Sequence, residues 1–96
     1  MSSSQKFDHN PLFHIEKFDN EILLYSVSKA EGVYLNETAY LVWEMCSKSN
    51  SIEEIVTLLE KAYPDQKDAI REDVHQTIES LVNNGALIAR DDISNP

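Results

Sequence analysis

A run of β-forming residues leads directly into a helix start within residues 32–41, and this junction divides the chain. Residues 33–35 are Val, Tyr and Leu, which favour a strand. Asn36 follows at once, and its side-chain oxygen can accept from the free N–H groups of a first helical turn. Glu37 then places negative charge at the positive end of the helix dipole. Strand patterns precede this junction, and helical patterns follow it.

Two further strands are predicted before the junction. Residues 12–17 alternate between apolar and polar side chains, which is typical of a strand with one solvent-exposed face. Residues 21–27 are apolar on both faces, so this strand is expected in the middle of the sheet. Asp19 and Asn20 between them form a turn signal. Short connections between successive strands favour an antiparallel meander.

Two helices are predicted directly after the junction. The first spans residues 37–46 and carries one apolar stripe at helical spacing, made by Ala39, Val42, Trp43 and Cys46. The second begins at Ser51, because Ser51 and Glu54 have the spacing of a capping box. It ends before Pro64, whose ring disfavours helical geometry in the preceding residue.

A third and longer helix is predicted after residues 65–67. Its buried face carries Ile70, Val74, Ile78 and Leu81. Residues 83–85 are Asn, Asn and Gly, and this helix is expected to stop there because glycine accepts the left-handed conformation of a C-terminal cap. Residues 86–89 form either a short strand or an extended tail that covers the core.

The order of these elements predicts an α+β fold that is winged-helix-like, with a three-stranded antiparallel sheet followed by three helices. Three strands alone cannot bury an apolar face, so the helices are expected to cover one side of the sheet. We divide the chain into a flexible N-terminal lead-in at residues 1–10, a folded domain at residues 11–90 and a flexible tail at residues 91–96.

The charge balance excludes some classes of partner. The 96 residues contain 8 Lys and Arg against 17 Asp and Glu, which gives a formal net charge of −9. Nucleic-acid binding normally rests on a positive patch, so this balance argues against DNA, RNA and anionic membranes. No apolar run reaches the roughly 18 residues of a membrane span, and residues 1–6 lack a signal-like apolar region. A cytoplasmic location is therefore expected.

Candidate catalytic and metal-binding side chains are scattered. His9, His14 and His75 do not form a ligand pattern. Cys46 lies on the apolar stripe of the first helix, where a buried core residue is the simpler interpretation. The only two glycines cannot build a phosphate-binding loop. We therefore predict no catalytic residue, no metal site and no cofactor.

A binding function is compatible with this elimination. The third predicted strand is short and last in the meander, so one of its edges is unpaired. An unpaired edge beside an apolar helix face can accept a peptide as an added strand. The alternative is an edge that is blunted and unused, and the residues alone do not rank one above the other.

The sequence resembles the PqqD-like proteins, peptide chaperones also called RiPP recognition elements, where RiPPs are ribosomally made and post-translationally modified peptides. The similarity extends over residues 13–89. It is carried by the segment 32–39 (Gly-Val-Tyr-Leu-Asn-Glu-Thr-Ala), the segment 42–44, the segment 51–56, Leu59, Tyr63, Asp73, Val74 and the segment 81–88. The family usually has Asp-Gly after the first helix, where this chain has Ser47 and Lys48. The break there is either longer, or the helix continues by a turn.

The resemblance implies a non-catalytic protein that binds the leader of a precursor peptide and presents it to a modifying enzyme. That enzyme would be a radical-SAM enzyme or a leader peptidase, in the biosynthesis of a peptide natural product or a quinone cofactor. The leader would add as a strand to the third strand, against the third helix. The implied contacts are Val33, Tyr34 and Leu35 on the strand and Arg71, Val74, His75, Ile78 and Leu81 on the helix. The protein would act as a monomer or a dimer.

Two alternative functions remain open from the residues. A winged-helix transcription regulator would need a basic recognition helix, whereas the third helix region offers Lys67 and Arg71 against five acidic residues: Asp65, Asp68, Glu72, Asp73 and Glu79. An acidic adaptor subunit would dock on an enzyme through its negative surface and hold no peptide of its own.

Overall fold

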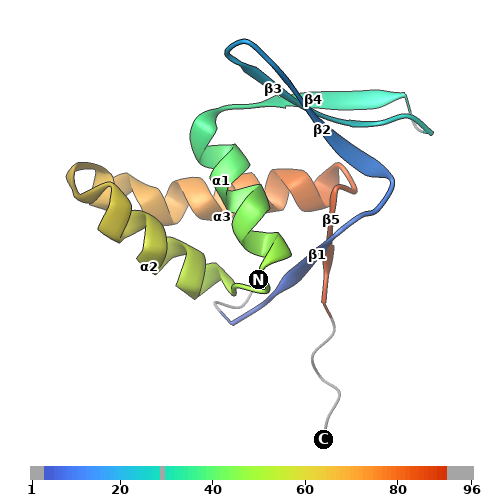
Figure 1. Ribbon diagram of the computed structural model, residues 1–96. Coiled ribbons are helices and arrows are strands. Elements are labelled where there is room, and N and C mark those ends of the chain that lie inside the picture. Colours follow the sequence, from blue (N-terminus) through green and yellow to red (C-terminus); the bar gives the residue numbers. More distant parts are fainter. Residues whose placement is uncertain (1–3, 29, 91–96) are drawn as a thin grey trace, which may run out of the picture.

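Two small antiparallel sheets and three α-helices make up the fold of the computed structural model, which describes residues 4–28 and 30–90 (Figure 1). This arrangement confirms the predicted α+β fold, with a three-stranded sheet followed by three helices. The predicted tail at residues 91–96 lies outside the described residues. The elements in order are β1 (Phe7–His9), β2 (Phe13–Phe18), β3 (Glu21–Ser26), β4 (Glu31–Leu35), α1 (Glu37–Ser47), α2 (Ile52–Ala62), the 3-10 turn η1 (Pro64–Gln66), α3 (Lys67–Asn83) and β5 (Leu87–Ala89).

The larger sheet has the strand order β2-β3-β4, with the most apolar strand in the centre as predicted. Its register pairs Leu24 of β3 with Ile15 and Val33 on either side. These three side chains face the helices, and Leu24 is completely buried. All three helices lie on this one side of the sheet (Figure 1). The opposite side carries the alternate residues, including the exposed Tyr34.

The predicted helix caps are present. The Ala39 N–H donates to Asn36 Oδ1 at 2.8 Å, which starts α1 at the junction. Ser51 and Glu54 form the complete capping box at the start of α2, with distances of 3.2 and 2.7 Å. Each such cap contributes about 1 kcal/mol. The helix positions therefore follow from local sequence.

The break after α1 resolves the two alternatives that the departure from the family pattern left open. The helix ends at Ser47 and does not continue by a turn. Ser49 takes a φ of 65°, in the left-handed region, and its N–H donates to the Cys46 carbonyl at 3.1 Å. A serine thus adopts the backbone geometry that glycine adopts more easily.

The core lies between the helices and the inner face of the sheet. The residues predicted for the buried face of α3 are all in it: Ile70, Val74, Ile78 and Leu81 are between 0% and 4% exposed. Gly85 has a φ of 84°, which confirms the predicted left-handed cap after this helix. The chain then forms β5, so the strand is the correct alternative for residues 86–89.

The prediction of a flexible lead-in at residues 1–10 is wrong for the part that the structure describes. Residues Phe7–His9 form β1, which pairs antiparallel with β5. Phe7 is only 1% exposed and belongs to the main core. The prediction failed because a three-residue strand in a polar context has no measurable periodicity, and its partner is about 80 residues away in the sequence.

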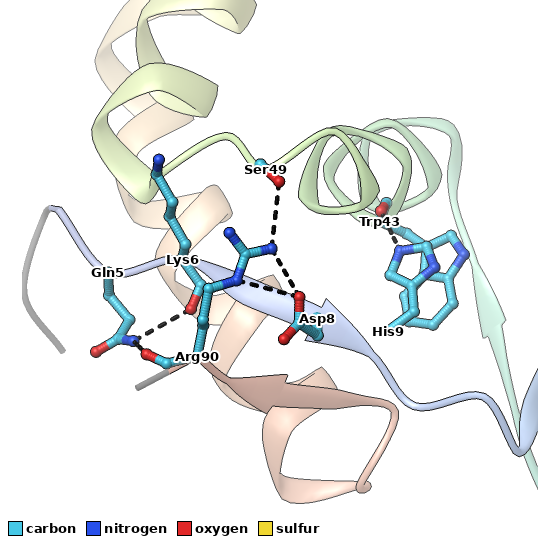
Figure 2. Close-up of polar contacts among 7 residues, drawn as sticks. All are labelled: Gln5, Lys6, Asp8, His9, Trp43, Ser49 and Arg90. Atoms are coloured by element: carbon cyan, nitrogen blue, oxygen red, sulfur yellow. Dashed lines mark hydrogen bonds and ion pairs between the residues drawn. The ribbon is translucent and has the colours of Figure 1, made fainter. Parts of the chain in front are cut away.

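Side-chain contacts fix this N-terminal segment in place (Figure 2). The Arg90 guanidinium donates to Asp8 at 2.7 Å and to Ser49 Oγ at 3.2 Å. The His9 ring stacks on the Trp43 indole with 3.5 Å between centroids, and His9 Nε2 donates to the Trp43 carbonyl at 2.6 Å. His9 therefore anchors β1 to α1.

Candidate functional site at the free edge of β4

The backbone of β4 has one edge that no strand within the described residues pairs. The β2–β3 hairpin turns through two residues, so its closing pair, Phe18 and Glu21, exchanges both backbone hydrogen bonds. Along a strand, the N–H and C=O groups of successive residues point to alternate edges. Leu24 is three residues after Glu21, so its N–H and C=O groups point away from β2 and toward β4.

The same alternation assigns the backbone groups of β4. Glu31, Val33 and Leu35 pair with the β3 residues that point toward them, so their N–H and C=O groups are used within the sheet. The N–H and C=O groups of Gly32 and Tyr34 point the other way, to the free edge. This edge thus presents two donors and two acceptors in the arrangement that an added strand requires.

A groove lies between the free edge of β4 and helix α3. It consists of a hollow of about 370 Å³ at the end of β4 and one of about 550 Å³ at its start, both lined by Val33. We refer to both together as the β4–α3 groove. The α3 side is lined by Asp73, Gln76, Thr77, Ser80, Leu81, Asn83 and the cap residue Asn84.

The chemistry of the groove suits an extended peptide. Val33, Leu35 and Leu81 provide apolar contacts, whereas hydroxyl and amide groups from α3 provide hydrogen-bonding partners. Asp73 and Glu31 are the charged residues in the lining, and both are acidic. Among the residues described, none with a basic side chain lines either hollow. The groove thus combines an unpaired backbone edge with apolar and polar side chains.

The residues implied by the family resemblance are only partly brought together here. Val33, Tyr34, Leu35 and Leu81 line the groove. Val74 and Ile78 are not in the lining, and both are completely buried in the core. Arg71 and His75 are also absent from the lining, since they lie further round α3. On the helix side, Leu81 is therefore the implied contact that lines the groove, and the implied peptide contacts stay a prediction.

The residues that replace them form a second stripe on α3. Asp73, Gln76, Thr77 and Ser80 follow the spacing i, i+3, i+4, i+7, displaced around the helix from the apolar stripe. Sequence reasoning missed them because polar helix residues usually face solvent. The sequence does contain a signal for this stripe. Three of its four residues are uncharged, whereas the solvent face of the same helix carries Glu72 and Glu79.

Arg71 has a different partner. Its guanidinium donates to both carboxylate oxygens of Glu53 on α2, at 2.9 and 3.0 Å. This hydrogen bonding lowers the pKa of Glu53 and raises the pKa of Arg71. Both side chains are about half exposed, so the pair links α2 to α3 with a small contribution to stability.

The described residues contain no group of three or more His, Cys, Asp or Glu side chains that could hold a metal ion. Cys46 is buried, and burial raises the pKa of its thiol to about 12. The thiol is therefore protonated near neutral pH, which suits the predicted core role and not nucleophilic chemistry. Of the helices in the described residues, none combines the length and apolar character needed to cross a bilayer.

Comparison with known proteins identifies the family. The family model described as "Coenzyme PQQ synthesis protein D (PqqD)" matches residues 13–87, which include the whole larger sheet, all three helices and the β4–α3 groove. The chain belongs to the PqqD family. The resemblance seen in the sequence is confirmed.

A curated relative of this PqqD-family chain is the "PqqA binding protein" of Methylococcus capsulatus, which is 37% identical over 62 residues. The match covers 64% of each protein, so the chain spans 64% of the length of this relative.

Two solved structures share the fold. One is described as "TbiB1 in Complex with the TbiA(beta) Leader Peptide", with a TM-score of 0.70, 18% identity and coverage of 83% of this chain and 93% of that one. The other is described as "Lasso peptide synthetase B1 complexed with the leader peptide", with a TM-score of 0.75, 22% identity and coverage of 86% and 98%. At these identities the similarity concerns the fold.

Proposed function

We propose that this protein binds the leader segment of a ribosomally made precursor peptide as an added strand on β4. The observation that carries the proposal is the β4–α3 groove. Its edge offers the backbone groups of Gly32 and Tyr34, and the groove provides side-chain pockets beside that edge. Each main-chain hydrogen bond contributes about 0.5–1.5 kcal/mol to binding. A few such bonds, together with apolar contacts in the groove, can therefore hold a peptide on β4.

Family membership supports the same class of ligand. The relative from Methylococcus capsulatus is named as a binder of PqqA, and the two proteins of the same fold are described as complexes with leader peptides. A precursor leader, of the PqqA type or from another modified peptide, is therefore the ligand that we propose. The proposed role is recognition without catalysis, as the resemblance to the PqqD family implies.

We propose further that the bound leader is presented to a modifying enzyme in the cytoplasm. A radical-SAM enzyme or a leader peptidase fits the family resemblance, in a pathway to a peptide natural product or a quinone cofactor. Presentation requires that the peptide is held at one place while the enzyme reaches its core segment. The β4–α3 groove would hold the leader segment and leave the core segment of the same peptide free for the enzyme.

Filling the groove tests the proposal. Ser80 is exposed on the groove side of α3, so Ser80→Trp places an indole where the added strand would lie. The probes are synthetic leader segments of the small precursor genes encoded beside this chain, titrated by fluorescence anisotropy. We expect micromolar binding to the unmodified protein and an affinity lower by about tenfold or more for Ser80→Trp.

Glu79→Trp is the matched control, because Glu79 is the neighbouring residue and faces solvent away from the groove. The control should bind the leader as the unmodified protein does. Leader binding that is absent in the folded protein, or equally reduced by both substitutions, would contradict the proposal.

A further inference from the structure

The side of the larger sheet that faces away from the helices is uncovered (Figure 1). The strand register places Glu16, Leu23 and Tyr34 in one row across the three strands. The next row consists of His14, Tyr25 and Gly32. Phe18 ends β2 on the same side. We call this surface the outer sheet face.

The centre of the outer sheet face is a packed apolar surface. Gly32 has no side chain, and the place of a Cβ there would be 3.2 Å from Leu23 Cδ1 and 3.3 Å from Tyr25 Cβ. Leu23 and Tyr25 thus close over the β4 backbone. Tyr34 stands beside them and is 65% exposed. A continuous exposed apolar patch on a small protein marks an interaction surface, and aromatic residues are enriched at such surfaces.

The border of this patch is acidic. Glu16 and Glu21 lie on the same face, with Asp19 in the turn next to them. Lys17 does not offset these charges, because it points to the opposite face, where its Nζ stands 4.2 Å from the centre of the Tyr40 ring. Within the described strands, no Lys or Arg side chain lies on the outer sheet face.

This charge pattern decides between two kinds of occupant. A second copy of the chain would bring two acidic borders together, and the net charge of −9 adds to the repulsion. A protein whose apolar patch is bordered by Lys or Arg matches both the centre and the border of the face. The charge complementarity therefore favours a different protein as the partner.

We propose that the outer sheet face docks a protein with an apolar patch bordered by basic residues, while the β4–α3 groove holds the peptide. This inference rests on the proposed function and extends it, because it gives the partner a surface of its own. The backbone edge of β4 belongs to the groove, whereas the side chain of Tyr34 belongs to the outer sheet face. An added peptide strand would extend the sheet sideways at this edge and leave the outer sheet face open. Both ligands are therefore held at once without competing.

A charge reversal on the outer sheet face tests the inference. The double variant Glu16→Lys with Glu21→Lys changes two exposed side chains and leaves the core unchanged. The probes are the other proteins encoded in the same gene cluster, purified one at a time and measured by biolayer interferometry at low and high salt. We expect one of them to bind the unmodified protein, with an affinity that falls by about tenfold in the double variant and falls with added salt.

The matched control is the double variant Glu72→Lys with Glu79→Lys, which makes the same charge change on the solvent face of α3. Phe18→Ser, which removes an exposed ring from the outer sheet face, should weaken partner binding as well. Equal losses in the two double variants, no binding by any protein of the cluster, or a dimer of the unmodified protein that forms through this face would overturn the inference.

Leader binding separates this inference from the proposed function. The variants of the outer sheet face should bind the leader as the unmodified protein does. If the unmodified protein docks a partner through the outer sheet face but binds no leader, the proposed function fails and the docking surface stands. The reverse result overturns the docking surface alone.

Discussion

Replacing Tyr34 with proline is expected to lower the affinity for the leader peptide by at least about tenfold, because one edge donor is lost and the added strand cannot lie flat against the ring. The backbone N–H of Tyr34 points to the free edge, so its removal breaks no hydrogen bond to β3. The residue is exposed, and its neighbour Val33 is already extended, which a following proline favours. Titration with the leader measures the loss of affinity, and a circular dichroism spectrum checks that the variant keeps its fold.

The opposite edge of the same sheet provides a matched control. By the same alternation, the N–H of Lys17 on β2 points away from β3, so Lys17→Pro also removes one edge donor. Lys17 lines neither hollow of the groove. Lys17→Pro should therefore keep the leader affinity. A Tyr34→Pro variant that folds and binds as tightly as Lys17→Pro would exclude strand addition at β4.

Replacing Phe7 with alanine is expected to lower the free energy of unfolding by about 3–5 kcal/mol, the usual cost of removing a buried aromatic ring. Phe7 is among the largest completely buried side chains, and it connects β1 to the main core. Small domains are stable by only about 5–15 kcal/mol, so this loss is a large part of the total. Urea denaturation followed by Trp43 fluorescence measures it.

Phe18→Ala is the matched control for that experiment. Its ring is 47% exposed on the outer sheet face, so the same chemical change should alter stability by only about 0.5–1 kcal/mol. If Phe7→Ala were as mild as Phe18→Ala, residues Phe7–His9 would not be part of the folded domain in solution.

The parts of the fold that local sequence determines could be predicted. Asn36 and the pair Ser51–Glu54 are capping residues whose hydrogen bonds reach only three residues, so their pattern locates the helix starts. The alternation along β2 and the apolar run of β3 likewise depend on neighbours in the sequence. The order of the larger sheet and the three helices follows from these signals.

The parts that depend on distant contacts could not be predicted. Nothing near Phe7 indicates that β5 will pair with its strand, because the pairing joins opposite ends of the domain. The α3 side of the groove also depends on a contact between segments that are distant in the sequence. Whether Ser80 faces a groove or open solvent depends on where β4 lies, which the helix sequence does not contain. The family resemblance points to Val74 and Ile78 as peptide contacts, whereas their apolar spacing on the helix indicates the core, where both lie.

Amide hydrogen exchange at β4, measured with and without the bound leader, tests strand addition most directly. Without the peptide, the amides of Gly32 and Tyr34 should exchange fast, whereas those of Val33 and Leu35 are protected by β3. With the leader bound, the exchange of Gly32 and Tyr34 should slow strongly and the alternation should disappear. Unchanged exchange at both residues, or new protection of Ile15 and Lys17 at the β2 edge instead, would contradict leader binding at the edge of β4.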